Sequence, residues 1–218
     1  MNESLKTQSA YIKKIRNQKL PVQKKINDLD VICLPKVYHG GTDSQLVIEM
    51  MKINQGDEVL DLCCGNGIIG LAATKMGARS VVGTDLNPEA IKNANLNKRK
   101  LGIKNLKFIK GDLFASITSK FDVVIINPPY TNKKAKDLTE ICFWDQNNSV
   151  TKRFFENVRN YLKKDGRAYL AWAEFANQDL IASLAAKNNC TIRLLGSKIS
   201  QSGFRFDVYL IMVINQQV

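Results

Sequence analysis

The segment Asp61-Leu62-Cys63-Cys64-Gly65-Asn66-Gly67 joins a predicted strand to a predicted helix and is the most informative part of this 218-residue sequence. The apolar run before it predicts a buried strand, and the residues after it have helical periodicity. Gly65 and Gly67 allow a sharp turn and a close approach of a ligand to the backbone. The amides at the start of the helix add a partial positive charge. With Gly70, the turn also matches Gly-x-Gly-x-x-Gly, so taken alone it fits dinucleotide binding or merely a tight turn.

Strands and helices alternate on both sides of this segment. Runs rich in Val and Ile predict strands at 58–62, 80–84, 106–110, 122–126, 167–172, 191–195 and 207–214. Helical patterns occupy 43–52, 67–76, 88–101, 150–162 and 178–187. This alternation predicts an α/β, Rossmann-like fold with a seven-stranded, mostly parallel sheet and helices on both faces. Because a turn-rich stretch at 196–203 replaces the last helix, we expect the last strand to be antiparallel and to close the sheet.

Charge is distributed unevenly along the chain. The sequence carries 32 Lys and Arg against 20 Asp and Glu, a net charge of +12. Residues 1–27 hold seven basic residues and one acidic residue, which is half of that excess. We therefore predict a basic N-terminal extension, residues 1–35, ahead of the main domain, residues 36–218. The excess favours contact with RNA, a ribosome or an acidic protein, although a lysine-rich proteome would give the same charge.

Composition argues against several other classes of protein. No apolar run approaches the roughly 20 residues of a membrane-spanning helix, and the polar start lacks a secretory signal. We therefore expect a cytoplasmic protein without membrane contact. Five scattered cysteines and a single histidine, His39, do not supply the closely spaced ligands of a structural zinc site. No metal is expected, and the thiols are expected to be reduced and mostly buried.

Carboxylates mark the ends of three consecutive predicted strands. Asp61 precedes the glycines, Asp85 ends the next strand, and Asp112 follows the third. The carboxyl ends of parallel strands share the edge of the sheet where ligands bind. Asp61 suits a cation and opposes a diphosphate, Asp85 can hold both ribose hydroxyls, and Asp112 suits an adenine amino group. The set predicts a cationic nucleoside such as S-adenosylmethionine, although any single carboxylate could instead cap a helix or stabilise a turn.

The segment Asn127-Pro128-Pro129-Tyr130 follows the most apolar predicted strand. Proline cannot continue a sheet ladder, so the prolines alone could simply end the strand. The side-chain oxygen of Asn127 and the carbonyl of Pro128 can, however, both accept hydrogen bonds from one NH2 group. They would hold that nitrogen and direct its lone pair toward a methyl donor. Tyr130 offers a flat face for a planar amide or base. The segment therefore predicts methyl transfer to nitrogen, with Asn127, Pro128, Pro129 and Tyr130 as the catalytic residues.

With these motifs, the chain resembles the class I S-adenosylmethionine-dependent methyltransferases of the HemK-like, "methyltransferase small domain" group over roughly residues 34–214. The resemblance rests on residues 37–44, on the glycine turn with its three carboxylates, and on the Asn-Pro-Pro-Tyr motif. It implies S-adenosylmethionine as the cofactor. The predicted cofactor-binding residues are Thr42, Asp61, Cys63, Gly65, Asn66, Gly67, Asp85, Leu86, Asp112, Leu113 and Asn127.

The resemblance leaves the substrate open between two classes. Members of this group methylate either the side-chain amide of glutamine in release factors or ribosomal protein, or the exocyclic amines of RNA bases. We expect a protein glutamine side chain of a translation factor or ribosomal protein. The alternative, favoured by the basic extension, is a base of rRNA or tRNA. A non-catalytic RNA- or ribosome-binding module on the same fold is the remaining hypothesis.

Overall fold

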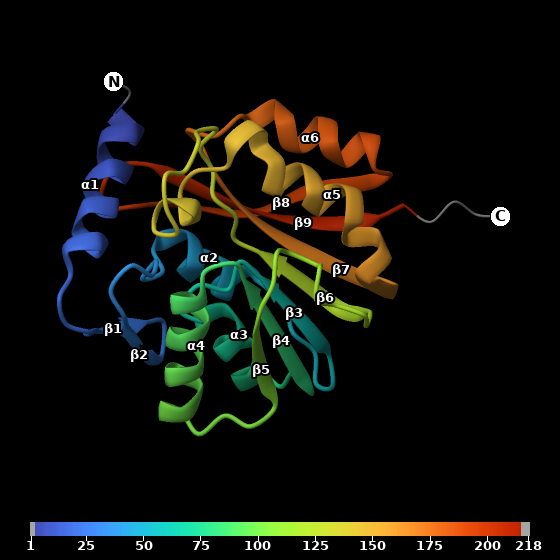
Figure 1. Cartoon of the computed structure of the whole chain (residues 1–218). Helices are drawn as coiled ribbons and strands as arrows, with labels where there is room; N and C mark the ends of the chain where they lie inside the picture. The colour runs from blue at the N-terminus through green and yellow to red at the C-terminus, as the bar shows by residue number, and fades with distance from the viewer. Residues whose placement is uncertain (1–2, 215–218) are drawn as a thin grey trace.

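A seven-stranded sheet runs through the centre of the structure (Figure 1). The structure is a computed structural model that describes residues 3–214; residues 1–2 of the predicted extension and 215–218 of the predicted main domain lie outside the described residues. The order of strands across the sheet is β5-β4-β3-β6-β7-β9-β8. The strands are β3 (Glu58–Leu62), β4 (Ser80–Asp85), β5 (Leu106–Lys110), β6 (Phe121–Ile126), β7 (Leu162–Ala173), β8 (Cys190–Ile199) and β9 (Arg205–Val213).

The predicted fold class is confirmed. Strands β3 to β7 pair in parallel, and β9 pairs antiparallel with both β7 and β8. The last strand is therefore antiparallel, as predicted, but the expectation that it closes the sheet is wrong, because β8 forms that edge. Burial explains why β9 lies inside the sheet and β8 at its edge. Val208 and Ile211 of β9 are fully buried, whereas Leu194 and Ile199 of β8 are largely exposed, so the more apolar strand takes the interior position.

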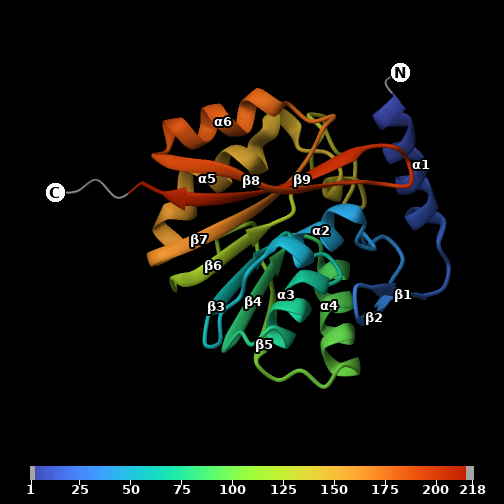
Figure 2. The same cartoon turned by 180° about the vertical axis from the view of Figure 1, so that it is seen from behind.

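Helices cover both faces of the sheet and enclose two apolar cores (Figure 2). Because side chains alternate along a strand, Val123 of β6 faces one core and Val124 the other. The first core packs against helices α2 (Thr42–Met50), α3 (Ile68–Lys75) and α4 (Pro88–Lys100). The second packs against α5 (Ser149–Tyr161) and α6 (Gln178–Lys187). Each fully buried aliphatic or aromatic side chain contributes about 1.5–3 kcal/mol to this packing.

The basic N-terminal residues form a helix and a hairpin. Helix α1 (Glu3–Asn17) precedes strands β1 (Val22–Ile26) and β2 (Leu29–Cys33), which pair antiparallel. Strand β1 was not among the predicted strands. Helix α1 buries Ile12 and Ile15 and lies beside the loop of residues 131–148, which we call the cap loop (Figures 1 and 2). Among residues 3–214, no helix has the length and apolar character needed to cross a membrane.

Candidate active site

A cavity of about 820 Å³ lies at the carboxyl ends of the parallel strands. Residues that follow β3, β4, β5 and β6 line it on one side. On the other side it is lined by Gln8 of α1, by residues of the cap loop, and by Val37, Tyr38, Gly40, Asp43 and Ser44. The volume lies toward the upper end of the range of small-molecule sites, roughly 300–1,000 Å³. It leaves space for a nucleoside cofactor together with a substrate side chain.

The glycine turn forms the floor of this cavity and depends on backbone conformations that favour glycine. Gly65 has φ +54 and lines the cavity, and an added Cβ there would have the Tyr38 carbonyl oxygen 3.9 Å away as its nearest neighbour. Gly67 has φ +84 and caps α3; an added Cβ there would come within 2.6 Å of the Phe108 ring. The first glycine thus keeps ligand space open, and the second allows the helix to pack closely.

Burial shifts the pKa of two carboxylates, one behind this turn and one beside it. Asp61 is fully buried; the Gly70 amide donates to its Oδ2 at 2.9 Å, and its Oδ1 has no partner among the described residues. Burial, partly offset by that hydrogen bond and reinforced by the charge of Asp85, raises the pKa of Asp61 to about 7. Burial also raises the pKa of Asp85, although the amides of Asn87 and Gly65 oppose this by donating to the carboxylate at 2.8 and 2.9 Å.

The third carboxylate is paired. Arg153 of α5 donates from Nη1 and Nη2 to the two oxygens of Asp112 at 2.8 and 2.9 Å. This bidentate geometry fixes the plane of the carboxylate and leaves its remaining lone pairs for a donor such as an amino group. No pattern in the sequence pointed to Arg153, which lies 41 residues from Asp112 and also lines the cavity.

The Asn-Pro-Pro-Tyr segment meets the start of α2. The side-chain nitrogen of Asn127 donates to Asp43 Oδ2 and to Ser44 Oγ, both at 3.1 Å. The hydroxyl of Tyr130 donates to Asn127 Oδ1 and lies 3.1 Å from Asp43 Oδ2. Burial raises the pKa of Tyr130 well above its usual range, and the nearby charge of Asp43 raises it further, so the hydroxyl stays protonated. The ring of Tyr130 contacts Trp172 edge-on, at 5.9 Å between ring centroids.

The structure brings most of the predicted residues to the cavity. Those that line it are Cys63, Gly65, Asn66, Asp85, Leu86, Asp112, Leu113, Asn127, Pro128, Pro129 and Tyr130. Thr42, Asp61 and Gly67 lie outside its lining. Asp43 and Ser44 line the cavity but were not among the predicted site residues, although they belong to the segment 37–44 on which the resemblance rests. Their spacing in the sequence fits capping equally well, so no local signal could have identified them.

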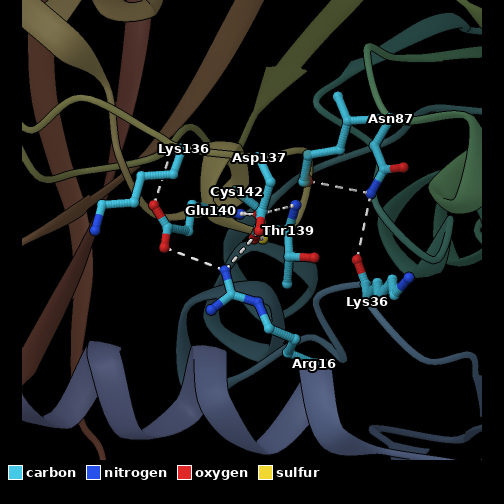
Figure 3. Close-up of polar contacts among 9 residues, drawn as sticks. Arg16, Lys36, Asn87, Lys136, Asp137, Thr139, Glu140 and Cys142 are labelled. Carbon is cyan, nitrogen blue, oxygen red and sulfur yellow. Dashed lines mark hydrogen bonds and ion pairs between the residues drawn. The ribbon is translucent and has the colours of Figure 1, made fainter.

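A second feature that the sequence did not reveal is the attachment of α1 to the cap loop (Figure 3). Arg16 donates to Asp137 at 2.7 Å and to Glu140 at 3.1 Å. Closer to the cavity, Thr131 donates to Gln8 at 3.1 Å. Asn87 connects the cap loop to the segment that follows β2. Its side-chain nitrogen donates to the carbonyls of Lys36 at 3.3 Å and of Leu138, in the cap loop, at 3.4 Å. The N-terminal helix and the loop that covers the cavity are therefore held together.

This combination of a glycine turn, carboxylates at neighbouring strand ends and a cavity above them defines a Rossmann-like enzyme with a nucleoside cofactor. The methyltransferase small domain family matches residues 28–188, more than half of the chain, and the protein belongs to that family. It is a methyltransferase, and its cofactor is S-adenosylmethionine.

Similar proteins include two named glutamine methyltransferases. A Methanocaldococcus jannaschii protein with the provisional name protein N5-glutamine methyltransferase is 36% identical over 138 residues, which cover 61% of this chain and 70% of the relative. The release factor glutamine methyltransferase of Fusobacterium nucleatum is 31% identical over 156 residues, 65% of this chain and 44% of the relative. The chain therefore spans less than half the length of the second enzyme.

Solved structures share the fold at low sequence identity. A methyltransferase from Pyrococcus furiosus superposes with a TM-score of 0.67 at 17% identity, over 98% of this chain and 100% of that one. A Thermus thermophilus 16S rRNA N2 G1207 methyltransferase, solved with AdoMet and guanosine, gives 0.68 at 20% identity, over 89% and 50% of the two chains. These similarities show the fold alone.

The residues at the cavity fit S-adenosylmethionine. The unpartnered oxygen of Asp61 and the raised pKa values of Asp61 and Asp85 both indicate a site whose negative charge lacks a partner. A cationic ligand would relieve this, whereas a diphosphate would increase the repulsion. The space above Gly65 leaves the backbone open to close approach.

Proposed function

We propose that this protein methylates the side-chain amide nitrogen of a glutamine in a translation factor or ribosomal protein. The observation that carries the proposal is the orientation of Asn127 at the cavity, with its nitrogen held by Asp43 and Ser44. Its oxygen already accepts one hydrogen bond from the Tyr130 hydroxyl, and its second lone pair can accept from a substrate NH2 group. The names of the archaeal and Fusobacterium relatives support glutamine as the bearer of that group.

The proposed chemistry needs positioning more than a strong base. S-adenosylmethionine, when bound, supplies an electrophilic methyl group on a sulfonium sulfur. Asn127 Oδ1 and the carbonyl of Pro128 would hold the amide NH2 and direct its lone pair toward that methyl. Pro128 and Pro129 stiffen the backbone of this segment, so little entropy is lost on binding. Tyr130 lines the cavity next to these residues.

The proposed cofactor contacts follow the three carboxylates. Asp85 would accept from the ribose hydroxyls, and Asp112, held by Arg153, from the adenine amino group. Asp61 would stabilise the positive charge of the ligand from behind the cavity wall. The remaining predicted cofactor-binding residues lie at the start of α2, in the glycine turn and after the strand ends, and would complete the site. They are Thr42, Cys63, Gly65, Asn66, Gly67, Leu86 and Leu113.

The N-terminal helix is proposed to contact the macromolecule that carries the substrate. Lys6, Lys13 and Lys14 of α1 are exposed, as are Lys19 after the helix and Lys25 of β1, and α1 itself lies beside the cap loop. A surface of this charge attracts acidic protein or RNA through long-range electrostatics. The same charge keeps an exocyclic amine of rRNA or tRNA as the second candidate substrate.

A labelling experiment on fractionated lysate tests the proposal. Lysate is incubated with the protein and methyl-labelled S-adenosylmethionine, with and without RNase, beside the Asn127→Ala variant. The expected result is label in a protein band that resists RNase and is lost with the variant. Label that appears only in RNA would contradict the glutamine proposal and favour the second substrate.

A further inference from the structure

Asp43 is a buried carboxylate at the start of α2 with no ion pair among the residues that the structure describes. It is only 3% exposed and lines the cavity. Its Oδ1 accepts from the Tyr38 hydroxyl at 2.8 Å and from the amides of Ser44 at 2.7 Å and Gly41 at 3.2 Å. A buried charge without a cation requires such hydrogen bonds. They leave its second oxygen, Oδ2, directed at the Asn-Pro-Pro-Tyr segment.

The chemistry of this contact fixes the orientation of Asn127. An ionised carboxylate only accepts hydrogen bonds, so the atom of Asn127 that faces Asp43 Oδ2 must be the NH2 nitrogen. Ser44 Oγ takes the second amide hydrogen, also at 3.1 Å. Both hydrogens of the side chain are thereby engaged on the α2 side. A rotation that exchanged the oxygen and nitrogen of Asn127 would place two acceptors against each other.

Tyr130 adds a second element to the same network. Its hydroxyl has one proton and two acceptors within reach, Asn127 Oδ1 and Asp43 Oδ2. While the proton points to Asn127, it uses one of the two lone pairs of Oδ1 and leaves the other for a substrate NH2 group. When the proton points to Asp43 instead, both lone pairs of Asn127 Oδ1 are available to the substrate. Asp43 thus provides an alternative acceptor for the Tyr130 proton.

We propose that Asp43 is a positioning residue for methyl transfer. It holds Asn127 with the side-chain oxygen toward the substrate and accepts the Tyr130 hydroxyl when substrate binds. The inference rests on the proposed function in one respect, that Asn127 Oδ1 receives the nitrogen to be methylated. The orientation of Asn127 itself can be measured without any substrate.

The test compares Asp43→Asn with Asp57→Asn as the matched control. Asp57 is also buried, but it lies just before β3, at the opposite end of the sheet, and pairs with Arg167. Losing one supporting residue of a reacting group costs about 10- to 100-fold in rate. We expect Asp43→Asn to lower kcat by that factor on the acceptor identified by labelling, while the Kd for S-adenosylmethionine changes far less. Asp57→Asn should reduce stability without this loss of kcat.

Two further readouts separate positioning from a structural role. Combining Asp43→Asn with Tyr130→Phe should give less than the product of the two single losses, because both act on Asn127. By NMR, the side-chain amide hydrogens of Asn127 should exchange slowly in the wild type and in Asp57→Asn, and rapidly in Asp43→Asn.

The outcomes distinguish the two proposals. Rapid exchange of the Asn127 amide in the wild type, or equal kcat losses in the two aspartate variants, would overturn the inference. Slow exchange that is lost in Asp43→Asn, together with methylation of RNA alone, would support the positioning role and contradict the glutamine proposal.

Discussion

Replacement of the buried Asp61 by asparagine should have opposite effects on stability and on cofactor binding. The Asp61 carboxylate is fully buried and has one unpartnered oxygen, and its pKa is raised to about 7. We expect Asp61→Asn to stabilise the cofactor-free protein near pH 8, because it removes a desolvated charge. The same variant should bind S-adenosylmethionine more weakly, because the charge that attracts the cation is gone. The oxygen of asparagine can still accept from the Gly70 amide.

The size and the sign of the stability effect follow from the pKa of Asp61. A rise from 3.8 to about 7 corresponds to about 4 kcal/mol as an upper bound. Because the folded pKa lies above the unfolded one, the wild type keeps its full stability below pH 3.8 and loses this contribution as pH rises through about 7. The stabilisation by Asp61→Asn should therefore grow between about pH 4 and pH 7 and level off above.

Urea unfolding of the two proteins at several pH values from about 5 to about 8 measures this difference. Calorimetric titration with S-adenosylmethionine measures the second effect. A charge-assisted interaction is worth about 1.5–3 kcal/mol, so affinity should fall by about 10- to 100-fold near pH 8. Wild-type affinity should rise with pH up to about 7, and the affinity of the variant should not. Asp57→Asn, at the other end of the same strand, should leave affinity unchanged.

Two results would contradict a buried, ionisable Asp61 that attracts the cofactor. One is a difference in unfolding free energy between Asp61→Asn and the wild type that does not change with pH. The other is a variant that binds the cofactor as tightly as the wild type near pH 8. Either would mean that the Asp61 carboxylate is neutral or well solvated.

Three further predictions concern other parts of the molecule. Asn127→Ala should lower kcat by about 100-fold or more and leave the cofactor Kd nearly unchanged, as measured by steady-state kinetics and calorimetry. Arg16→Ala should lower stability by about 1 kcal/mol or less, because its ion pairs are partly exposed, and limited proteolysis should cut the cap loop faster. Burial, with the charges of Lys24 and Lys14, lowers the pKa of His39 to about 4, so the stability that the neutral ring contributes is lost as pH falls from 6.5 toward about 4. Unfolding of His39→Gln over that range should lack this loss.

The sheet could be predicted because its strands are short apolar runs separated by helical patterns. The position of β9 within the sheet could not be predicted. The order of the last two strands depends on which is more deeply buried, and β8 also carries apolar residues such as Ile192 and Leu194, so the sequence does not distinguish them. Strand β1 was missed because Lys24 and Lys25 occupy its centre and it pairs only with β2. Local patterns do not report such pairings.

Within the site, the residues at strand ends were predictable because each adjoins a strong apolar strand. Asp43 was not, since it approaches Asn127 across 84 residues of sequence. Arg153 lies 41 residues from Asp112, and Arg16 lies 121 residues from Asp137. These contacts form only when the folded chain brings distant elements together, so no spacing in the sequence encodes them.

Mass-spectrometric mapping of the methylated atom shows directly whether the protein methylates a glutamine amide. A release factor with a Gly-Gly-Gln sequence is incubated with the protein and S-adenosylmethionine, digested and fragmented, with Asn127→Ala as the control. We expect one added methyl group on the side-chain amide of that glutamine, and none with the variant. An unmodified glutamine, beside a methylated RNA base in a parallel reaction with ribosomal or transfer RNA, would contradict it.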